Sequence, residues 1–256
     1  MVALILACDT PPGGMVCIEG GPFLRGTDDG PKNERPRATI QVDTFYMDVY
    51  EVDVAHYDSC VSAKKCRPAK TNYSDYSRPT QPKVGVKWFD AVQYCKAVGK
   101  HLPTEAEWEK AARGIEPVTC ERAVIMDERG RRSCGVEKQG GHPEKGRTLE
   151  VGSRPPTPLG LYDMAGNAEE WVFDWASKSY AACGDACTRD NPRGPCDGAV
   201  KCPGYTERVV RGGSWYWPAD HATATHRRFH TPANHPIYHH FGFRCAASEA
   251  EARALR

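Results

Sequence analysis

Alternating apolar and polar residues fill the first part of the chain, and this period of two predicts β-strands. Residues 14–27 (GMVCIEGGPFLRGT) alternate in this way and have glycines at the bends, as expected for a pair of strands. Residues 38–54 (ATIQVDTFYMDVYEVDV) are rich in β-branched and aromatic side chains and predict further strand. We therefore expect these segments to form β-structure.

A helical period follows. Asp53 can cap a helix over residues 54–63, because its carboxylate can accept a hydrogen bond from a free amide of the first turn. Residues 86–100 predict a second helix that ends at Gly99. Its apolar face is expected to consist of Phe89, Val92, Cys95 and Val98.

A third helix is predicted over residues 102–114. Thr104 and Glu107 have the spacing of a capping box, and Gly114 stops the helix. Beyond Gly114 the chain holds mainly turns and short strands, and 24 glycines and 20 prolines among 256 residues agree with many loops. We predict one α+β domain that is rich in loops and has little regular secondary structure.

The charges are balanced. There are 34 basic and 33 acidic residues, interspersed along the chain, with a formal net charge of +1. This balance argues against a nucleic-acid partner and against binding to an acidic membrane surface. No apolar run is long enough to span a bilayer. We expect a globular monomer.

The twelve cysteines are the feature of the composition that says most about the class of protein. Such a number is typical of exported proteins with disulfides, and the close pairs Cys60/Cys66 and Cys120/Cys134 fit short disulfide loops. Residues 183–202 (CGDACTRDNPRGPCDGAVKC) hold four more, whose connectivity the spacing leaves open. A zinc site is the alternative there, although the tight paired spacings of zinc ribbons and fingers are absent from this segment.

The N-terminal segment has two interpretations. Residues 1–13 combine an apolar run, Ala7, Cys8 and a Pro/Gly linker, and look like the tail of a bacterial lipoprotein signal with a membrane-anchoring lipid on Cys8. Alternatively, Cys8 pairs with Cys17. Both interpretations place the protein outside the cytoplasm, in the periplasm, at the cell surface or in the medium.

Six ordered motifs resemble one family. They are GGPFLRG, FYMDVYEV, VKWFDAVQYCKAVGKHLPTEAEWEKAARG, GLYDMAGNAEEWVFDW, RVVRGGSW and GFRCA. Their order is similar to that of the formylglycine-generating enzyme (sulfatase-modifying factor) family, over about residues 14–247, and we assign this domain to residues 14–250. The resemblance implies a single domain with a fold related to C-type lectins.

The resemblance also implies a disulfide between Cys95 and Cys245. Closing so long a loop would contribute about 4–5 kcal/mol in the chain-entropy model. It further implies a structural Ca²⁺ site in the LYDMAGNAEEW segment. The ligands carried over by position are the side chains of Asp163 and Glu170 and the carbonyl oxygens of Gly166 and Ala168, and hard oxygen ligands suit Ca²⁺. The alternative is a surface turn with Glu170 solvated.

The family's oxidase chemistry depends on two cysteines, five residues apart, that hold Cu(I) and the substrate thiol. The matching positions here are Trp217 and Ala222, and neither side chain can supply a thiolate. We therefore expect neither a copper site nor formylglycine formation.

Several polar residues cluster in the sequence after this point: Asp220, His221, His226, His230, His235, His239 and His240. They have the chemistry of metal ligands, and an enzyme of altered chemistry, an oxidoreductase with or without a His-bound metal, is the alternative function. Their spacing matches no recognised ligand set, so we favour ordinary loop histidines.

The turn at residues 214–217 would line a groove in this family. Alternation places Trp215 and Trp217 on one face and Tyr216 on the other. The groove residues that we expect are Ser214, Trp215, Trp217, Asp220, His221 and Arg228. Our hypothesis is an exported, calcium-stabilised module that binds a peptide, glycan or protein partner.

Overall fold

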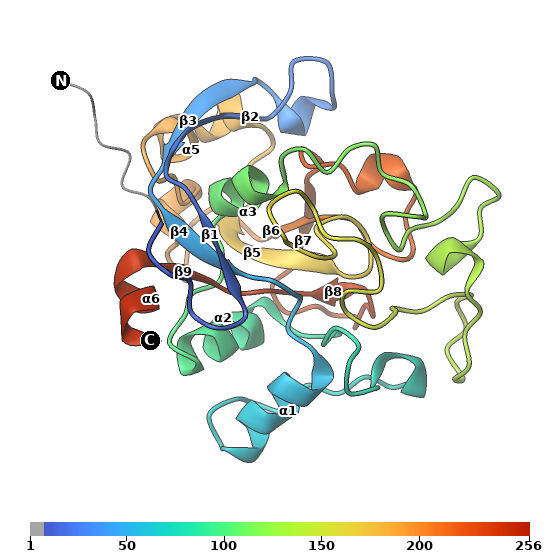
Figure 1. Cartoon of the computed structure of the whole chain (residues 1–256). Coiled ribbons are helices and arrows are strands. Elements are labelled where there is room, and N and C mark those ends of the chain that lie inside the picture. Colours follow the sequence, from blue (N-terminus) through green and yellow to red (C-terminus); the bar gives the residue numbers. More distant parts are fainter. Residues whose placement is uncertain (1–7) are drawn as a thin grey trace.

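Three small sheets and six short helices form the regular structure of residues 8–256, the part of the chain that the computed structural model describes (Figure 1). The first sheet has the order β1-β4-β9 and is antiparallel. Its strands are β1 (Met15–Ile18), β4 (Phe45–Asp48) and β9 (Ala246–Ser248). The two ends of the described chain therefore meet in one sheet.

The second sheet is an antiparallel pair of β2 (Gly21–Arg25) and β3 (Ala38–Val42). The two strands predicted within residues 14–27 are thus present, but each pairs with a later strand instead of its neighbour. The expected strand at residues 38–54 is likewise divided between two sheets. Gly20 lies between β1 and β2, and Thr44 lies between β3 and β4. The Gly20 amide donates to Thr44 Oγ1 at 3.0 Å, so the two connections between the first and second sheets lie next to each other.

The third sheet lies at the centre of Figure 1 and has the order β7-β6-β5-β8. Its strands are β5 (Glu169–Trp175), β6 (Arg208–Arg211), β7 (Arg228–His230) and β8 (Phe241–Gly242). β8 runs parallel to β5, and the other pairs are antiparallel. The long connections between Gly114 and β5, green to yellow in Figure 1, lie on the side of the molecule away from α6.

The three predicted helices are confirmed. α1 (Val54–Ser62) is capped by Asp53, which accepts from the His56 amide at 2.7 Å. α2 (Trp88–Ala97) is followed by Gly99 at φ +76°, and α3 (Glu105–Ala112) has the capping box of Thr104. The remaining helices are α4 (Tyr180–Cys183), α5 (Asp185–Thr188) and α6 (Glu249–Ala254).

Five one-turn segments complete the regular structure in residues 8–256: η1 (Lys32–Glu34), η2 (Ser74–Tyr76), η3 (Arg132–Gly135), η4 (Pro195–Gly198) and η5 (Ala219–His221). Two of them, η3 and η4, contain central residues with positive φ and are left-handed turns, not true 3-10 helices.

The buried face of α2 differs from the prediction. Trp88, Ala91, Tyr94 and Cys95 are buried, whereas Phe89 is 37% exposed. The indole of Trp88 donates to the Val172 carbonyl at 2.8 Å, which holds this residue against β5 and turns Phe89 outward. Only Cys95 of the expected face lies fully in the core.

The twelve cysteines form six disulfides. The pairs are Cys8–Cys17, Cys60–Cys66, Cys95–Cys245, Cys120–Cys134, Cys183–Cys187 and Cys196–Cys202. The sulfur of Cys8 is therefore bonded to Cys17 and is not available to a lipid in this structure, while the apolar residues 1–7 of the signal-like segment lie outside the described residues. The four cysteines between 183 and 202 pair with near neighbours, which excludes a thiolate zinc site there.

Within residues 8–256, none of the helices has the length and apolar content needed to cross a bilayer.

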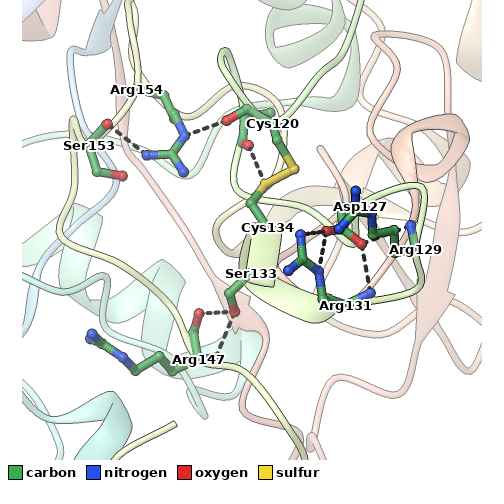
Figure 2. Close-up of a disulfide and its surroundings, with 10 residues drawn as sticks. Cys120, Asp127, Arg129, Arg131, Ser133, Cys134, Arg147, Ser153 and Arg154 are labelled. Atoms are coloured by element: carbon green, nitrogen blue, oxygen red, sulfur yellow. Dashed lines mark hydrogen bonds and ion pairs between the residues drawn. A yellow bond between two sulfur atoms is a disulfide. The ribbon is translucent and has the colours of Figure 1, made fainter. Parts of the chain in front are cut away.

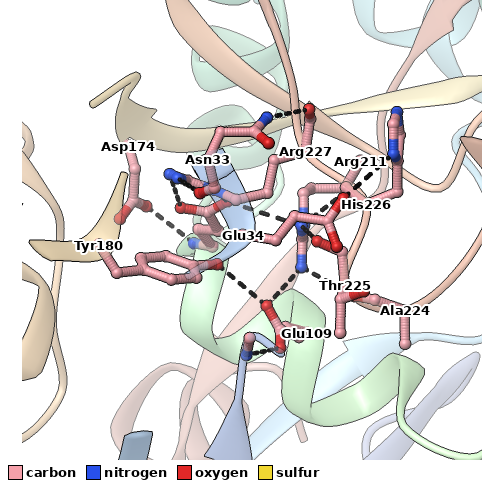
Figure 3. Close-up of polar contacts among 12 residues, drawn as sticks. Asn33, Glu34, Glu109, Asp174, Tyr180, Arg211, Ala224, Thr225, His226 and Arg227 are labelled. Carbon is pink, nitrogen blue, oxygen red and sulfur yellow. Dashed lines mark hydrogen bonds and ion pairs between the residues drawn. The ribbon is translucent and has the colours of Figure 1, made fainter. Parts of the chain in front are cut away.

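A buried network of charges joins α3 to the central sheet (Figure 3). Glu109 accepts from Arg211 Nη2 at 2.6 Å, from the Gly26 amide at 2.6 Å and from the Tyr180 hydroxyl at 3.1 Å. Arg211 also donates to the carbonyl oxygens of Ala224, Thr225 and His226. This network fixes the chain between residues 224 and 227, which leads into β7.

Candidate ligand-binding site

A tight turn follows β6. Gly212 and Gly213 have φ values of +89° and +65°, which side chains rarely adopt. A Cβ on Gly213 would lie 2.6 Å from the His221 carbonyl oxygen and 2.9 Å from Ala222 Cβ. The second glycine is therefore required for residues 214–222 to fold back on the end of β6.

The 215–217 segment is held by main-chain bonds on both sides. The Trp215 amide donates to Asn167 O at 3.0 Å, and Trp215 O accepts from the Ser133 amide at 2.8 Å. Trp217 O accepts from the Met126 amide at 2.8 Å. The turn is thus fixed between Asn167, which lies just before β5, and the 120–134 loop.

The 120–134 loop is itself rigidly built (Figure 2). The disulfide Cys120–Cys134 closes it, and the Asp127 carboxylate accepts from the amides of Arg129 and Arg131 at 3.0 and 2.8 Å. Ser133 exchanges hydrogen bonds with Arg147 O and the Arg147 amide. The loop therefore provides a firm support for the 215–217 turn.

A pocket of about 400 Å³ opens beside this turn, a volume typical of small-ligand sites. We call it the aromatic pocket. Most of its walls are aromatic or imidazole rings. The lining residues are His142, Pro143, Glu144, Trp215, Tyr216, Trp217, Arg228, His230, Ile237, Tyr238, His239, His240 and Phe241.

Cations cover two of these rings. The Arg228 guanidinium lies 4.4 Å from the centre of the Trp217 ring, and the His221 ring stacks on Trp217 at 5.1 Å. The Arg132 guanidinium lies 3.7 Å from the centre of the Tyr216 ring. These contacts hold the rings in place and occupy the sites where a cationic ligand would bind.

The arginine and glutamate side chains around the pocket form ion pairs with one another. Arg228 Nη1 contacts Glu169 Oε2 at 2.7 Å, and Arg132 Nη1 contacts Glu144 Oε2 at 2.6 Å. Burial raises the pKa of Glu169 to about 7, although Arg228 opposes this change. The pocket therefore has one buried ion pair and one at its rim.

The imidazoles of the pocket are neutral at pH 7. Burial lowers the pKa of His239 to about 4 and that of His240 to about 3, with smaller contributions from neighbouring positive charges. Burial also lowers the pKa values of His142 and His230. A neutral imidazole has one donor and one acceptor nitrogen, so these walls offer both kinds of hydrogen bond.

Three polar atoms of the pocket residues are buried without a hydrogen-bond partner: Trp217 Nε1, His230 Nε2 and His239 Nε2. Buried polar groups of folded proteins normally have partners. All three atoms belong to side chains that line the aromatic pocket.

The sequence-predicted groove residues are only partly brought together. Trp217 and Arg228 line the pocket, and His221 supports Trp217 from behind. Ser214 is fully buried, with its hydroxyl accepting from the Tyr216 amide, and Asp220 lies outside the pocket, where it pairs with His221 at 2.9 Å.

The expected alternation of residues 215–217 is wrong because this segment is a turn and not a strand. Trp215 is 1% exposed and packs in the core against Tyr76, contributing only one edge of the pocket, whereas Tyr216 and Trp217 are both half-buried. Side chains in a turn follow the local backbone angles, so a period of two does not apply to them.

Sequence reasoning missed His142, Glu144, Ile237 and Tyr238. The last two have exposed fractions of 41% and 40% and stand at the pocket. The aromatic density of residues 235–243 was a usable signal for them. His142 and Glu144 come from a distant loop, and no local pattern marks them.

The histidines are not arranged as the ligands of a metal ion. Among residues 8–256, no three His, Cys, Asp or Glu side chains are arranged so that they could hold a metal ion. His226 instead faces Glu34 at 3.3 Å (Figure 3), and His221 stacks on Trp217.

The residues of the expected calcium site fit the ion in part. Asp163 Oδ2 accepts from the Gly152 amide at 2.7 Å, while its Oδ1 is buried without a partner. Burial raises the pKa of Asp163 to about 6, and the nearby Glu170 charge adds to this. Both oxygens of Glu170 already accept from Arg244, and its Oε2 also accepts from Trp108 Nε1.

A second buried carboxylate lies in the same region. Glu51 accepts from the Asn167 side chain at 2.7 Å and from the Ala168 amide at 2.8 Å. Burial, with the charges of Asp163 and Glu170, raises its pKa well above the ordinary value. These three carboxylates all interact with the guanidinium of Arg244, with Arg154 as a weaker second cation for Asp163, and a cation next to Asp163 Oδ1 would relieve the remaining negative charge.

Comparison with known proteins places this geometry in a family. Residues 6–249 match the family described as "Sulfatase-modifying factor enzyme 1-like domain". The formylglycine-generating enzyme of Thermomonospora curvata is 31% identical over 292 aligned residues, which cover 91% of this chain and 93% of that protein. The mouse "Inactive C-alpha-formylglycine-generating enzyme 2" is 28% identical, with 91% and 85% covered.

A further relative is longer. Serine/threonine-protein kinase pkn1 of Chlamydia pneumoniae is 33% identical over 250 residues, which cover 91% of this chain and 37% of that protein. The chain therefore spans little more than a third of the length of the chlamydial kinases that it matches.

Solved structures agree with these relatives. PvdO from Pseudomonas aeruginosa superposes with a TM-score of 0.68 at 25% identity, covering 93% of this chain and 99% of that one. Treponema denticola variable protein 1 superposes with a TM-score of 0.66 at 21% identity, covering 91% and 94%. The second likeness shows a shared fold.

Proposed function

Since the chain belongs to the sulfatase-modifying factor enzyme family, we propose that it is a member without formylglycine-generating chemistry, which binds a peptide, glycan or protein partner. The observation that carries this proposal is that Trp217 and Ala222, and not cysteines, stand at the positions that the resemblance assigns to the family's copper-binding pair. All twelve cysteines are in disulfides, so no thiolate is left to bind Cu(I). A mouse relative that is named inactive supports the same view.

The aromatic pocket supports the binding role. Trp217 presents a large ring at the position that the resemblance assigns to a catalytic cysteine, and Tyr216 and Tyr238 line the same pocket. Aromatic side chains in a concave site provide large contact areas, and a few polar atoms orient the ligand. Six disulfides indicate an oxidising compartment outside the cytoplasm, and we propose that the partner is met there.

The loss of oxidase chemistry can be tested directly. The purified protein is incubated with Cu(I), oxygen, a thiol reductant that supplies the two further electrons needed to reduce O2 to water, and a cysteine-containing sulfatase peptide, and the aldehyde product is measured by mass spectrometry. The Thermomonospora curvata relative serves as the positive control. We expect no product above the level without protein, and turnover comparable to that of the control would show that the proposal is wrong.

The binding role needs a separate measurement. Ligand-observed NMR with a panel of short peptides, neutral disaccharides and uronic acids should find a binding class. Trp217→Ala should weaken that binding at least tenfold, because removing a central aromatic residue from a binding site typically costs about 2 kcal/mol or more. Phe89→Ala is the control, since Phe89 is exposed and is not part of the pocket. A Trp217→Ala protein that folds and binds as the wild type does would contradict the role of this pocket.

We also propose that Ca²⁺ stabilises the fold. Asp163 would hold the ion through its unpartnered oxygen, with the carbonyl oxygens of Gly166 and Ala168, and Glu170 adds negative charge while it stays bonded to Arg244. The ion would neutralise part of the charge that Glu51, Asp163 and Glu170 share. Its contribution is structural.

Calcium binding is tested by thermal unfolding. At a free Ca²⁺ concentration 100-fold above the dissociation constant, one site stabilises the fold by about 2.7 kcal/mol, so chelation should lower the melting temperature by several degrees. Asp163→Ala should abolish this dependence, whereas Asp127→Ala, in the 120–134 loop, should retain it. An unchanged melting temperature after chelation of the wild-type protein would refute the site.

A further inference from the structure

The charges around the aromatic pocket decide which ligands can bind there. When Glu169 is ionised, above its pKa of about 7, Arg228 is neutralised by Glu169 and Arg132 by Glu144, and the imidazoles of His239 and His240 are neutral. An anionic ligand would bring an unbalanced negative charge into this partly desolvated space. A cationic ligand would find the faces of Trp217 and Tyr216 already covered by guanidinium groups. The ligand that fits is therefore neutral.

The pocket is also polar enough to exclude a purely apolar ligand. Trp217 Nε1, His230 Nε2 and His239 Nε2 lack partners, and a hydrocarbon would leave all three unsatisfied, which is unfavourable for buried polar atoms. The indole N–H can only donate, whereas a neutral imidazole can donate or accept. A hydroxyl group meets both requirements, because it donates one hydrogen bond and accepts others.

An aromatic side chain at the mouth of the pocket, that of Tyr238, is partly exposed to solvent. Tyr238 is 40% exposed, and Ile237 beside it is 41% exposed. The Tyr238 ring is held by a stacked contact with His240 at 5.5 Å and an edge contact with His230 at 5.0 Å. The Tyr238 amide donates to the buried Asn234 side chain at 3.1 Å, which fixes the backbone of this loop. A fixed, exposed ring suits an apolar C–H face.

We propose that the aromatic pocket binds one neutral sugar ring of a glycan. A pyranose combines the required properties: a C–H face that packs on Tyr238, and hydroxyl groups for the unpartnered atoms of Trp217, His230 and His239. The pocket volume of about 400 Å³ suits a ligand of this small size. This inference rests on the proposed binding role and names the class of ligand.

The test uses saturation-transfer difference NMR on the full chain. The probes are neutral disaccharides built from glucose, galactose, mannose or N-acetylglucosamine, with glucuronic acid and a capped Ala-Phe-Ala peptide for comparison. We expect at least one neutral disaccharide to bind and glucuronic acid to bind at least tenfold more weakly. Failure of every neutral disaccharide at 10 mM would overturn the proposal.

Two variants locate the site. Tyr238→Ala should weaken sugar binding at least tenfold, while Tyr50→Ala should leave it unchanged, because Tyr50 is similarly exposed but is not part of the pocket. His239→Phe keeps a planar ring and removes the unpartnered nitrogen, so it should weaken sugar binding severalfold without lowering the melting temperature. Sugar binding that both pocket variants leave intact would contradict the assignment.

The outcomes separate this inference from the broader function. If only the peptide binds, and Tyr238→Ala weakens it, the sugar assignment fails while the binding role stands. If the oxidase assay yields formylglycine, the broader function fails whichever sugar binds.

Discussion

Arg227 and Glu105 show how this chain keeps charged side chains in its interior. Arg227 Nε and Nη2 donate to the two oxygens of Glu105 at 2.6 and 2.8 Å, and Arg227 Nη1 donates to Asn33 O at 2.6 Å. Both side chains are almost fully buried. Burying a charge is costly unless it is paired and hydrogen-bonded, so each partner depends on the other.

This dependence can be measured with Arg227→Met. The substitution leaves the Glu105 carboxylate buried with its closest partner removed, and we expect the free energy of unfolding to fall by about 3–5 kcal/mol. Arg131→Met is the matched control, because the side chain of Arg131 is 57% exposed and its ion pair with Asp127 should contribute little to stability. Urea unfolding followed by fluorescence compares them, and equal losses would contradict this view of the buried pair.

At the scale of elements, one histidine joins two helix starts. His101 Nδ1 lies 2.7 Å from Glu251 Oε2, and its Nε2 lies 3.3 Å from both oxygens of Glu107. Glu107 belongs to the capping box of α3, and Glu251 to that of α6. Burial lowers the pKa of His101, but the hydrogen bonds and charges of the two carboxylates outweigh it and raise the pKa to about 10.

The sign of the resulting pH dependence follows from this raised pKa. The folded state holds the His101 proton more tightly than the unfolded state, so the stabilisation is complete below about pH 6.5 and disappears as the pH rises from there through 10. His101→Gln should lose about 1.5–3 kcal/mol at pH 6 and show a flatter decline in unfolding free energy between pH 7 and 10. A wild-type-like slope in the variant would show that His101 is not the titrating group.

At the scale of the whole molecule, the family fold predicted from six motifs is confirmed by the family match and by the superposition with PvdO. The molecule is closed by contacts between distant parts of the chain. β1 and β9 flank β4 in one sheet, and Cys95 on α2 is bonded to Cys245 just before β9 across 150 residues. The unfolded chain loses much of its freedom when such a loop is closed.

We therefore expect the disulfides to contribute unequally. The Cys95→Ala/Cys245→Ala double variant should lose about 4–5 kcal/mol in the chain-entropy model, whereas Cys183→Ala/Cys187→Ala, with a separation of only 4 residues, should lose about 2 kcal/mol. Thermal and urea unfolding of both variants measure the difference. The reverse order would mean that local strain or packing, and not loop length, governs these bonds.

The sequence by itself determined the elements that depend on local interactions. Asp53 and Thr104 cap the helices that they were predicted to cap, because a capping hydrogen bond joins residues only two or three positions apart. The order of the six motifs likewise determined the family. The absence of cysteine at positions 217 and 222 is also a property of the sequence alone.

Only the tertiary structure decided the strand partners, the burial of Trp215 and Ser214, the pairing of Cys8 with Cys17, and the walls of the aromatic pocket. His142, Trp217 and Tyr238 meet there from three separate loops. Periodicity describes how neighbouring residues face one another along a strand or helix, and it contains no information on which distant turns pack together. The placement of these rings depends on the glycine turn after β6 and on the bonds to Asn167, Ser133 and Met126, which join segments far apart in the chain.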